Sequence, residues 1–333
     1  MKPREAVVFP VVLALSLGTA ALLFWPRVRS RDAAAPPPVE PTAAPVEPAV
    51  TAPPKPPPPP LPAYVHPSPD SAAACGEGMV LVDGVYCPFV GHRCIDKREN
   101  ADDVCERFGP EVLCEGTLER KRFCVDVYEY PNMEGVLPAV LVDFNEAKRA
   151  CAVEGKRLCS VEEWEFACEG PGMWPYPYGA ERDAEACNID RPILPPDMGA
   201  FSEPRSVGPE MERVDKRVAS GAMPRCISPF GVRDMTGNVD EWVDNPQGKR
   251  IEPPYRSSLK GGAWGATRGR CRPITASHDE HFRFYQVGFR CCADPKDGRA
   301  ANLPPGTRRP KVGRMDLPER DRPPRGRPGR ETP

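Results

Sequence analysis

The chain lacks the motifs of the common soluble enzymes. Its 333 residues contain no Gly-x-Ser-x-Gly, His-Glu-x-x-His or phosphate-cradling loop, so hydrolase and nucleotide-binding readings have no support. No Cys-x-x-Cys pair occurs, and the formal net charge is only −2. The first absence disfavours a structural zinc site, and the small charge gives no general attraction to nucleic acid. We therefore expect no nucleic-acid partner.

Cysteine is absent from the first 74 residues, yet fourteen cysteines follow. An even, dense set is typical of disulfides formed in an oxidising compartment. Zinc binding is the alternative, but the adjacent Cys291 and Cys292 do not suit one tetrahedral site. The sequence thus predicts disulfides and an extracytoplasmic location, in the periplasm or at the cell surface.

The amino terminus agrees with export. Residues 6–25 are twenty uncharged, mostly apolar positions, enough to cross a bilayer as a transmembrane helix. We predict that residues 1–30 are an uncleaved signal anchor that contacts the membrane. A cleaved signal peptide is the alternative, because small residues suited to a signal peptidase follow at 31–36. The mature protein would then be secreted.

Proline is concentrated at the two ends. Seventeen of the 46 prolines lie in residues 26–70, so residues 31–73 are predicted to be a proline-rich linker, either an extended polyproline II spacer or plain disorder. Residues 296–333 contain eleven Lys or Arg against five Asp or Glu. They are predicted to form a disordered basic tail, or one that contacts an acidic surface polymer.

The part able to build a core lies between these ends. Residues 74–121 are interpreted as a cysteine-rich annex with little regular structure, and residues 122–295 as one larger domain. Helical periodicity with a capping pair at the start predicts helices over 143–155 and 160–170. Elsewhere Gly, Pro and Asn are too frequent for long elements. The expected fold class is α+β with low regular secondary structure.

Six motifs follow one another in the central region. They are GKRLCSVEEWEFACEG at 155–170, YPYG at 176–179, CNI at 187–189, SPFGVRDMTGNVDEWVDN at 228–245, KGGAWG at 260–265 and VGFRCC at 287–292. This succession resembles the sulfatase-modifying-factor, or formylglycine-generating-enzyme, family over about residues 122–295. The resemblance implies a fold related to C-type lectins, with many disulfides.

The turn GVRDMTGNVDEW carries two carboxylates seven residues apart, Asp234 and Glu241. Carboxylates and carbonyl oxygens in such a turn can surround a calcium ion, although a capped turn leading into a buried tryptophan is the alternative. The resemblance implies calcium here, bound by these two side chains and by the backbone oxygens of Gly237 and Val239. It implies a second calcium site that begins at Asn188 and Ile189.

The later carboxylate of that second site has one candidate, Asp197. The resemblance also implies two long-range disulfides, with a third as a further expectation. These pairs are Cys151–Cys291, Cys168–Cys271 and Cys159–Cys292. The pairing of the other cysteines stays open.

The family's oxidases hold copper between two cysteines separated by four residues, since soft thiolates suit Cu(I). This chain has no cysteine between Gly262 and Cys271, and if Cys271 is the second ligand its companion position is Ala266. The serine that follows the glycine pair in the family is Ala263, and the tryptophan of the calcium turn is Asp240. The resemblance therefore implies no catalytic residues and no copper here.

Two other groups of residues have a functional and a plain interpretation. His278 and His281 are spaced for two metal ligands on a helix, but the resemblance places them in an irregular surface segment. A set of arginines can line a pocket for a carboxylate or sulfate, or can pair with the chain's own acidic residues. That set is Arg268, Arg270, Arg272, Arg283 and Arg290.

Together these features predict a non-catalytic binding or scaffold module with a protein or glycan partner in the cell envelope, and with calcium as its cofactor. The rival hypothesis is an enzyme that oxidises a sulfatase cysteine to formylglycine with atypical metal ligands.

Overall fold

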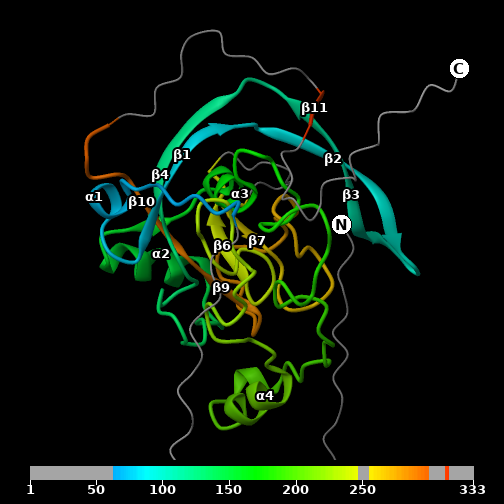
Figure 1. Ribbon diagram of the computed structural model, residues 1–333. Helices are drawn as coiled ribbons and strands as arrows, with labels where there is room; N and C mark the ends of the chain where they lie inside the picture. Colours follow the sequence, from blue (N-terminus) through cyan, green and yellow to red (C-terminus); the bar gives the residue numbers. More distant parts are fainter. Residues whose placement is uncertain (1–62, 247–254, 300–311, 315–333) are drawn as a thin grey trace, which may run out of the picture. The chain divides into compact units, whose positions relative to one another are not determined.

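A computed structural model describes residues 63–246, 255–299 and 312–314 (Figure 1). Every described residue belongs to one unit, which lies within Pro56–Pro333. The predicted anchor at residues 6–25 therefore lies outside the described residues. Within the described ranges, no helix is both long and apolar enough to cross a membrane.

The two predicted helices are confirmed. α2 spans Phe144–Val153 and α3 spans Val161–Glu169. Their N-cap residues, Asp143 and Ser160, each close a capping box with the glutamate three residues later, which satisfies two otherwise unpaired backbone donors. Each helix carries a cysteine on its buried face, Cys151 in α2 and Cys168 in α3. The buried face of each helix therefore also holds its disulfide.

The other described helices are short. They are α1 (Ser71–Cys75), the 3-10 helix η1 (Ala200–Ser202) and α4 (Val207–Val214).

One antiparallel sheet joins the annex to the domain. Its strand order is β1 (Met79–Tyr86), β4 (Glu119–Asp126), β10 (Cys291–Ala293) and β5 (Arg157–Leu158). Val125 of β4 is opposite Cys292 of β10. Since β4 pairs with strands on both sides, the annex shares backbone hydrogen bonds with the domain and the predicted boundary at residues 121–122 falls inside this strand.

The second sheet places two motifs side by side. Its order is β8 (Ile274–Thr275), β7 (Ser257–Lys260), β6 (Asp240–Asp244) and β9 (Val287–Phe289). β6 runs parallel to β9. The end of the predicted calcium turn therefore lies directly beside the GFR segment, although the two are about fifty residues apart in the sequence.

The annex contains far more regular structure than predicted. β2 (Phe89–Arg98) and β3 (Ala101–Glu115) form a long antiparallel hairpin, drawn in cyan in Figure 1. β11 (Val312–Arg314), from the predicted disordered tail, pairs with the outer edge of β3. The expectation of little regular structure is wrong because bulges interrupt the alternation of buried and exposed residues in this hairpin, and alternation is the signal for a strand.

Candidate functional site

The fourteen cysteines form seven disulfides and none is free. The two pairs implied by the resemblance, Cys151–Cys291 and Cys168–Cys271, are present, and so is the further expected pair Cys159–Cys292. The others are Cys75–Cys124, Cys87–Cys114, Cys94–Cys105 and Cys187–Cys226. No thiolate is therefore available to a soft metal in the described domain.

The segment where the resemblance places the copper thiolates is a tight loop after β7. Gly261 and Gly262 both have positive φ, and a Cβ at Gly262 would lie 2.5 Å from the Thr267 carbonyl oxygen, so this turn needs glycine. Cys271 is fully buried in its bridge to α3. The carbonyl oxygen of Ala266 accepts a hydrogen bond from Arg182 at 2.7 Å.

Asp240, which stands in place of the family's tryptophan, is paired with an arginine of this loop. Its Oδ2 lies 2.7 Å from Nη2 of Arg268, and its Oδ1 accepts a hydrogen bond from the amide of Gly262 at 3.2 Å. Burial raises the pKa of Asp240 to about 6, while the guanidinium of Arg268 acts in the opposite direction. An ion pair thus lies beside the position that the resemblance gives to redox chemistry.

The calcium turn ends in a buried ion pair. Arg290 donates to both carboxylate oxygens of Glu241, from Nε at 2.7 Å and from Nη2 at 2.6 Å, and Trp164 Nε1 donates to the same carboxylate at 2.7 Å. Both oxygens of Glu241 thus accept hydrogen bonds from the chain's own donors.

Two more carboxylates lie close to this pair. Burial raises the pKa of Glu129 well above its ordinary value and that of Asp234 to about 6, and their mutual proximity to Glu241 adds to the effect. Asp234 Oδ2 accepts from the Gly221 amide at 2.7 Å, and Glu129 accepts from Asn238 and Val239. Among the described residues, no group of three or more His, Cys, Asp or Glu is arranged to hold a metal ion.

At the second predicted calcium position, the side chain of Arg191 binds Asn188. A Cβ at Gly237 would lie 2.3 Å from the carbonyl oxygen of Asn188. The backbones of the two implied calcium sites are therefore in contact at Gly237. Asn188 Oδ1 accepts a hydrogen bond from Arg191 Nε at 3.2 Å, and Ile189 is fully buried. Asp197 is exposed and caps its own turn by accepting from Gly199 at 2.9 Å. The side-chain oxygens of Asn188 and Asp197 thus each accept a hydrogen bond from the chain itself.

The arginine set is mostly paired with the chain's own acids. Arg268 pairs with Asp240, Arg272 with Glu165 and Glu169, Arg283 with Asp143 and Glu146, and Arg290 with Glu241. The guanidinium of Arg270 lies 5.3 Å from the ring centroid of Phe108. The plain interpretation of this set is therefore confirmed for four of its five members. His278 and His281 lie in a loop, where His278 stacks on Phe282.

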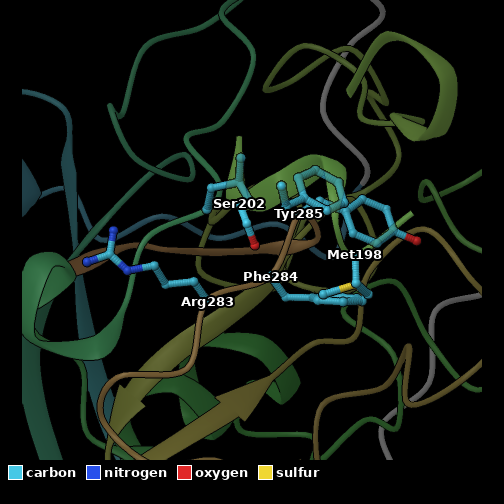
Figure 2. A pocket seen from close by; sticks show the side chains of 7 residues that line it. Met198, Ser202, Arg283, Phe284 and Tyr285 are labelled. Carbon is cyan, nitrogen blue, oxygen red and sulfur yellow. The ribbon is translucent and has the colours of Figure 1, made fainter. Parts of the chain in front are cut away.

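An apolar cavity of about 360 Å³ lies between η1 and the segment before β9 (Figure 2). Its lining residues are Leu141, Met198, Phe201, Ser202, Arg283, Phe284 and Tyr285. In Figure 2 the Arg283 guanidinium points away from the rings of Phe284 and Tyr285, so the cavity walls are mostly apolar, with Ser202 among the lining residues.

Sequence reasoning missed this cavity. Phe201 and Met198 come from a segment that carries none of the family motifs, and Phe201 stacks on Tyr285 with ring centroids 5.5 Å apart. The hydroxyl of Tyr285 and Nε1 of the neighbouring Trp264 are buried without a hydrogen-bond partner among the described residues. The apolar residues and prolines at 192–201 are the only signal of this cavity in the sequence. The aromatic residues that complete it, Phe284 and Tyr285, lie more than eighty positions after Phe201.

Two solved structures share part of this architecture at low similarity. PvdO from Pseudomonas aeruginosa is 20% identical, with a TM-score of 0.39, and the match covers 65% of this chain and 94% of PvdO. CarF is 15% identical, with a TM-score of 0.38, and the match covers 65% of this chain and 97% of CarF.

Two curated relatives are named inactive C-alpha-formylglycine-generating enzyme 2. The protein from Bos taurus is 29% identical over 177 residues, which cover 51% of this chain and 52% of the relative. The protein from Mus musculus is 29% identical over 168 residues, which cover 47% and 49%. The chain thus spans about half the length of the curated relatives it matches.

Residues 121–295 match the family described as the sulfatase-modifying factor enzyme 1-like domain. The matched region contains the two capped helices, the glycine turn after β7 and the disulfides that join them. With that match over more than half of its length, this chain belongs to the sulfatase-modifying-factor family.

Proposed function

We propose that this protein is a non-catalytic member of its family, a binding or scaffold module that works outside the cytoplasm. The observation that carries the proposal is that the loop between Gly262 and Cys271, where the resemblance implies copper ligands, contains no cysteine. Cys271 itself is bonded to Cys168, and the companion position is Ala266. Without a thiolate pair, nothing in this loop can bind Cu(I) and activate oxygen.

The curated relatives support this reading. Both carry the word inactive in their names, and the part of this chain that matches the family lacks the implied serine and tryptophan as well. The seven disulfides support an oxidising compartment, because such bonds persist outside the cytosol. The apolar residues 6–25 would hold the protein at a membrane if they are retained.

The partner we propose is a protein rather than a glycan. The cavity lined by Phe201, Phe284 and Met198 is apolar, and such a cavity suits an aliphatic or aromatic side chain better than a sugar with many hydroxyl groups. Met198 is 53% exposed at its rim, which makes it accessible to an incoming chain. A flexible methionine adapts to differently shaped side chains.

The central experiment measures copper content and turnover of the exported full chain. The protein is supplied with copper, oxygen and a peptide carrying a sulfatase-type cysteine motif. We expect no bound copper, no free thiol and no aldehyde product. The double variant Cys168→Ala, Ala266→Cys offers two thiols in the loop and serves as a comparator for copper binding. Stoichiometric copper with aldehyde formation by the native protein would establish the rival oxidase.

A second experiment tests the cavity. A photo-cross-linking residue at Met198 is expected to capture an envelope protein whose yield falls when Phe284 is replaced by Ala. The same cross-linker at Val153, which is 88% exposed on α2, is the matched control. Equal yields from the two positions would rule out the cavity as the binding site.

A further inference from the structure

The strand β3 of the annex hairpin accepts extended segments along one of its two edges. Its other edge pairs with β2. On the accepting edge, the amide of Phe108 donates to the carbonyl oxygen of Ala180 at 3.1 Å, and the amide of Arg182 donates to that of Glu106 at 2.7 Å. Further along the strand, β11 pairs with residues 111–113 (Figure 1, red). Two segments from distant parts of the sequence thus share this edge.

The part of β3 that pairs with β11 is held firmly from its inner side. Val112 and Cys114 are buried, and they belong to one apolar cluster with Trp174 and Tyr176 of the domain. Cys114 is also bonded to Cys87, which precedes β2. Because this stretch of backbone is already ordered, a strand that pairs with it pays only for its own ordering.

β11 itself is weakly attached. It pairs with β3 through three residues, and the twelve residues 300–311 separate it from Arg299, which contacts Asp70 at 3.3 Å. Closing a loop of this length costs conformational entropy, whereas each backbone hydrogen bond gained is modest in water. A longer strand that forms more of these bonds would therefore replace β11.

The solvent face of this edge combines acidic and apolar side chains. Glu111, Leu113 and Glu115 alternate along β3 and are all exposed, and Phe89 of β2, opposite Glu115, is 56% exposed. Glu111 pairs with Arg93 at 3.2 Å, but such a pair between exposed side chains is weak. The edge is therefore complementary to a strand that carries basic and apolar residues.

We propose that residues 111–115 of β3 are a docking edge for an extended strand of a protein partner, and that β11 occupies this edge until the partner strand replaces it. The partner strand carries basic and apolar residues and no proline, because proline cannot donate to the ladder. The tail's own residues 311–317, KVGRMDL, have this composition and lie between Pro310 and Pro318. None of the residues 111–115 lines the cavity near η1, so this site is separate from the one in the proposed function.

A peptide titration of the exported full chain tests the docking edge. The probe is a fluorescent peptide of residues 311–317, followed by anisotropy. The double variant Val312→Pro, Gly313→Pro, which we call the open-edge variant, removes the β11 pairing, since neighbouring residues of a strand direct their amides to opposite sides and one of the two faces β3. We expect this variant to bind the peptide about tenfold more tightly than the wild type, whose edge is occupied.

The matched control is Arg325→Pro, Gly326→Pro, which places the same pair of prolines later in the tail and should bind as the wild type does. On the docking edge, Glu115→Lys in the open-edge variant should weaken binding by about threefold. Glu77→Lys, at an exposed position outside the hairpin, should leave the affinity unchanged.

Two methylated peptides distinguish strand pairing from nonspecific attraction to the acidic side chains. One carries an N-methyl group at position 313, and the other carries N-methyl groups at positions 312 and 314. One of these patterns blocks the amides that face β3, and the other blocks those that face away. We expect the open-edge variant to bind only one of the two peptides. Equal affinity for both, or no gain in affinity of the open-edge variant over the wild type, would overturn the proposal.

Discussion

Arg272 is the residue at which the annex, α3 and a disulfide meet. It is buried, and it pairs with two carboxylates of α3, Glu165 and Glu169. A buried carboxylate that loses its partner is costly, because its charge stays in a medium of low polarity.

We predict that Arg272→Met lowers the free energy of unfolding by about 3–5 kcal/mol, the range for breaking a buried ion pair. The measurement is urea unfolding of the purified exported chain. Arg93→Met is the control, since Arg93 pairs with Glu111 where both side chains are at least half exposed, and it should lose about 1 kcal/mol or less. Similar losses for the two variants would show that the carboxylates of α3 do not depend on Arg272.

His92 makes the stability of the folded chain depend on pH. Burial lowers its pKa to about 4; the hydrogen bond with the Met173 carbonyl opposes this shift, and the nearby Arg272 and Arg270 add to it. An unfolded histidine titrates near 6.5. Because the folded pKa is the lower one, the neutral His92 contributes full stability above about pH 6.5, and that contribution is lost as the pH falls toward 4.

The prediction compares the pH dependence of stability in the wild type and in His92→Gln. Between pH 7 and pH 5 the wild type should lose about 1 kcal/mol more stability than His92→Gln, after allowing for partial exposure of the ring. His66→Gln, at an exposed position, should follow the wild type. Parallel pH profiles for wild type and His92→Gln would show that His92 does not titrate between these pH values.

At the scale of elements, the disulfides matter because they join parts that are distant in the sequence. Cys168–Cys271 links α3 to the 266–272 loop across 103 residues, whereas Cys94–Cys105 spans 11 residues within one hairpin. In the chain-entropy model, the longer loop restricts the unfolded chain more.

Replacing Cys168 and Cys271 together by Ala should therefore cost about 4.7 kcal/mol, and replacing Cys94 and Cys105 about 3 kcal/mol or less. Thermal and urea unfolding of the two double variants give the comparison. A larger loss for the short loop would mean that the hairpin's own packing, rather than loop length, dominates.

In the predicted calcium turn, side chains that the resemblance implies as ligands are hydrogen-bonded to other residues of the chain. Arg290 and Trp164 bind the carboxylate of Glu241, and Arg191 binds Asn188. We predict that the unfolding midpoint is the same in calcium and in chelator, with magnesium as the control ion. A rise that appears with calcium alone would show that the backbone oxygens of Gly237 and Val239 recruit the ion regardless.

At the scale of the whole molecule, the sequence predicted those parts of the fold that form through interactions between residues close in the sequence. The capping boxes at Asp143 and Ser160 mark both helices, because a capping box needs only residues three apart. The disulfides Cys151–Cys291 and Cys168–Cys271 came from a match of ordered motifs. The long hairpin was missed, since bulges between Cys94 and Arg98 shift its register and its inner face is defined by packing on Met173 and Tyr176 of the domain.

The sequence by itself determined the family, the two helices, the even set of cysteines and the loss of a second copper ligand, since each depends on residue identity at short or motif-defined spacing. Only the tertiary structure decided which cations meet which carboxylates, that Arg270 lies over Phe108 of the annex, and that Phe201 stacks on Tyr285. These contacts join residues many tens of positions apart, and a charge or ring in the sequence does not specify its distant partner.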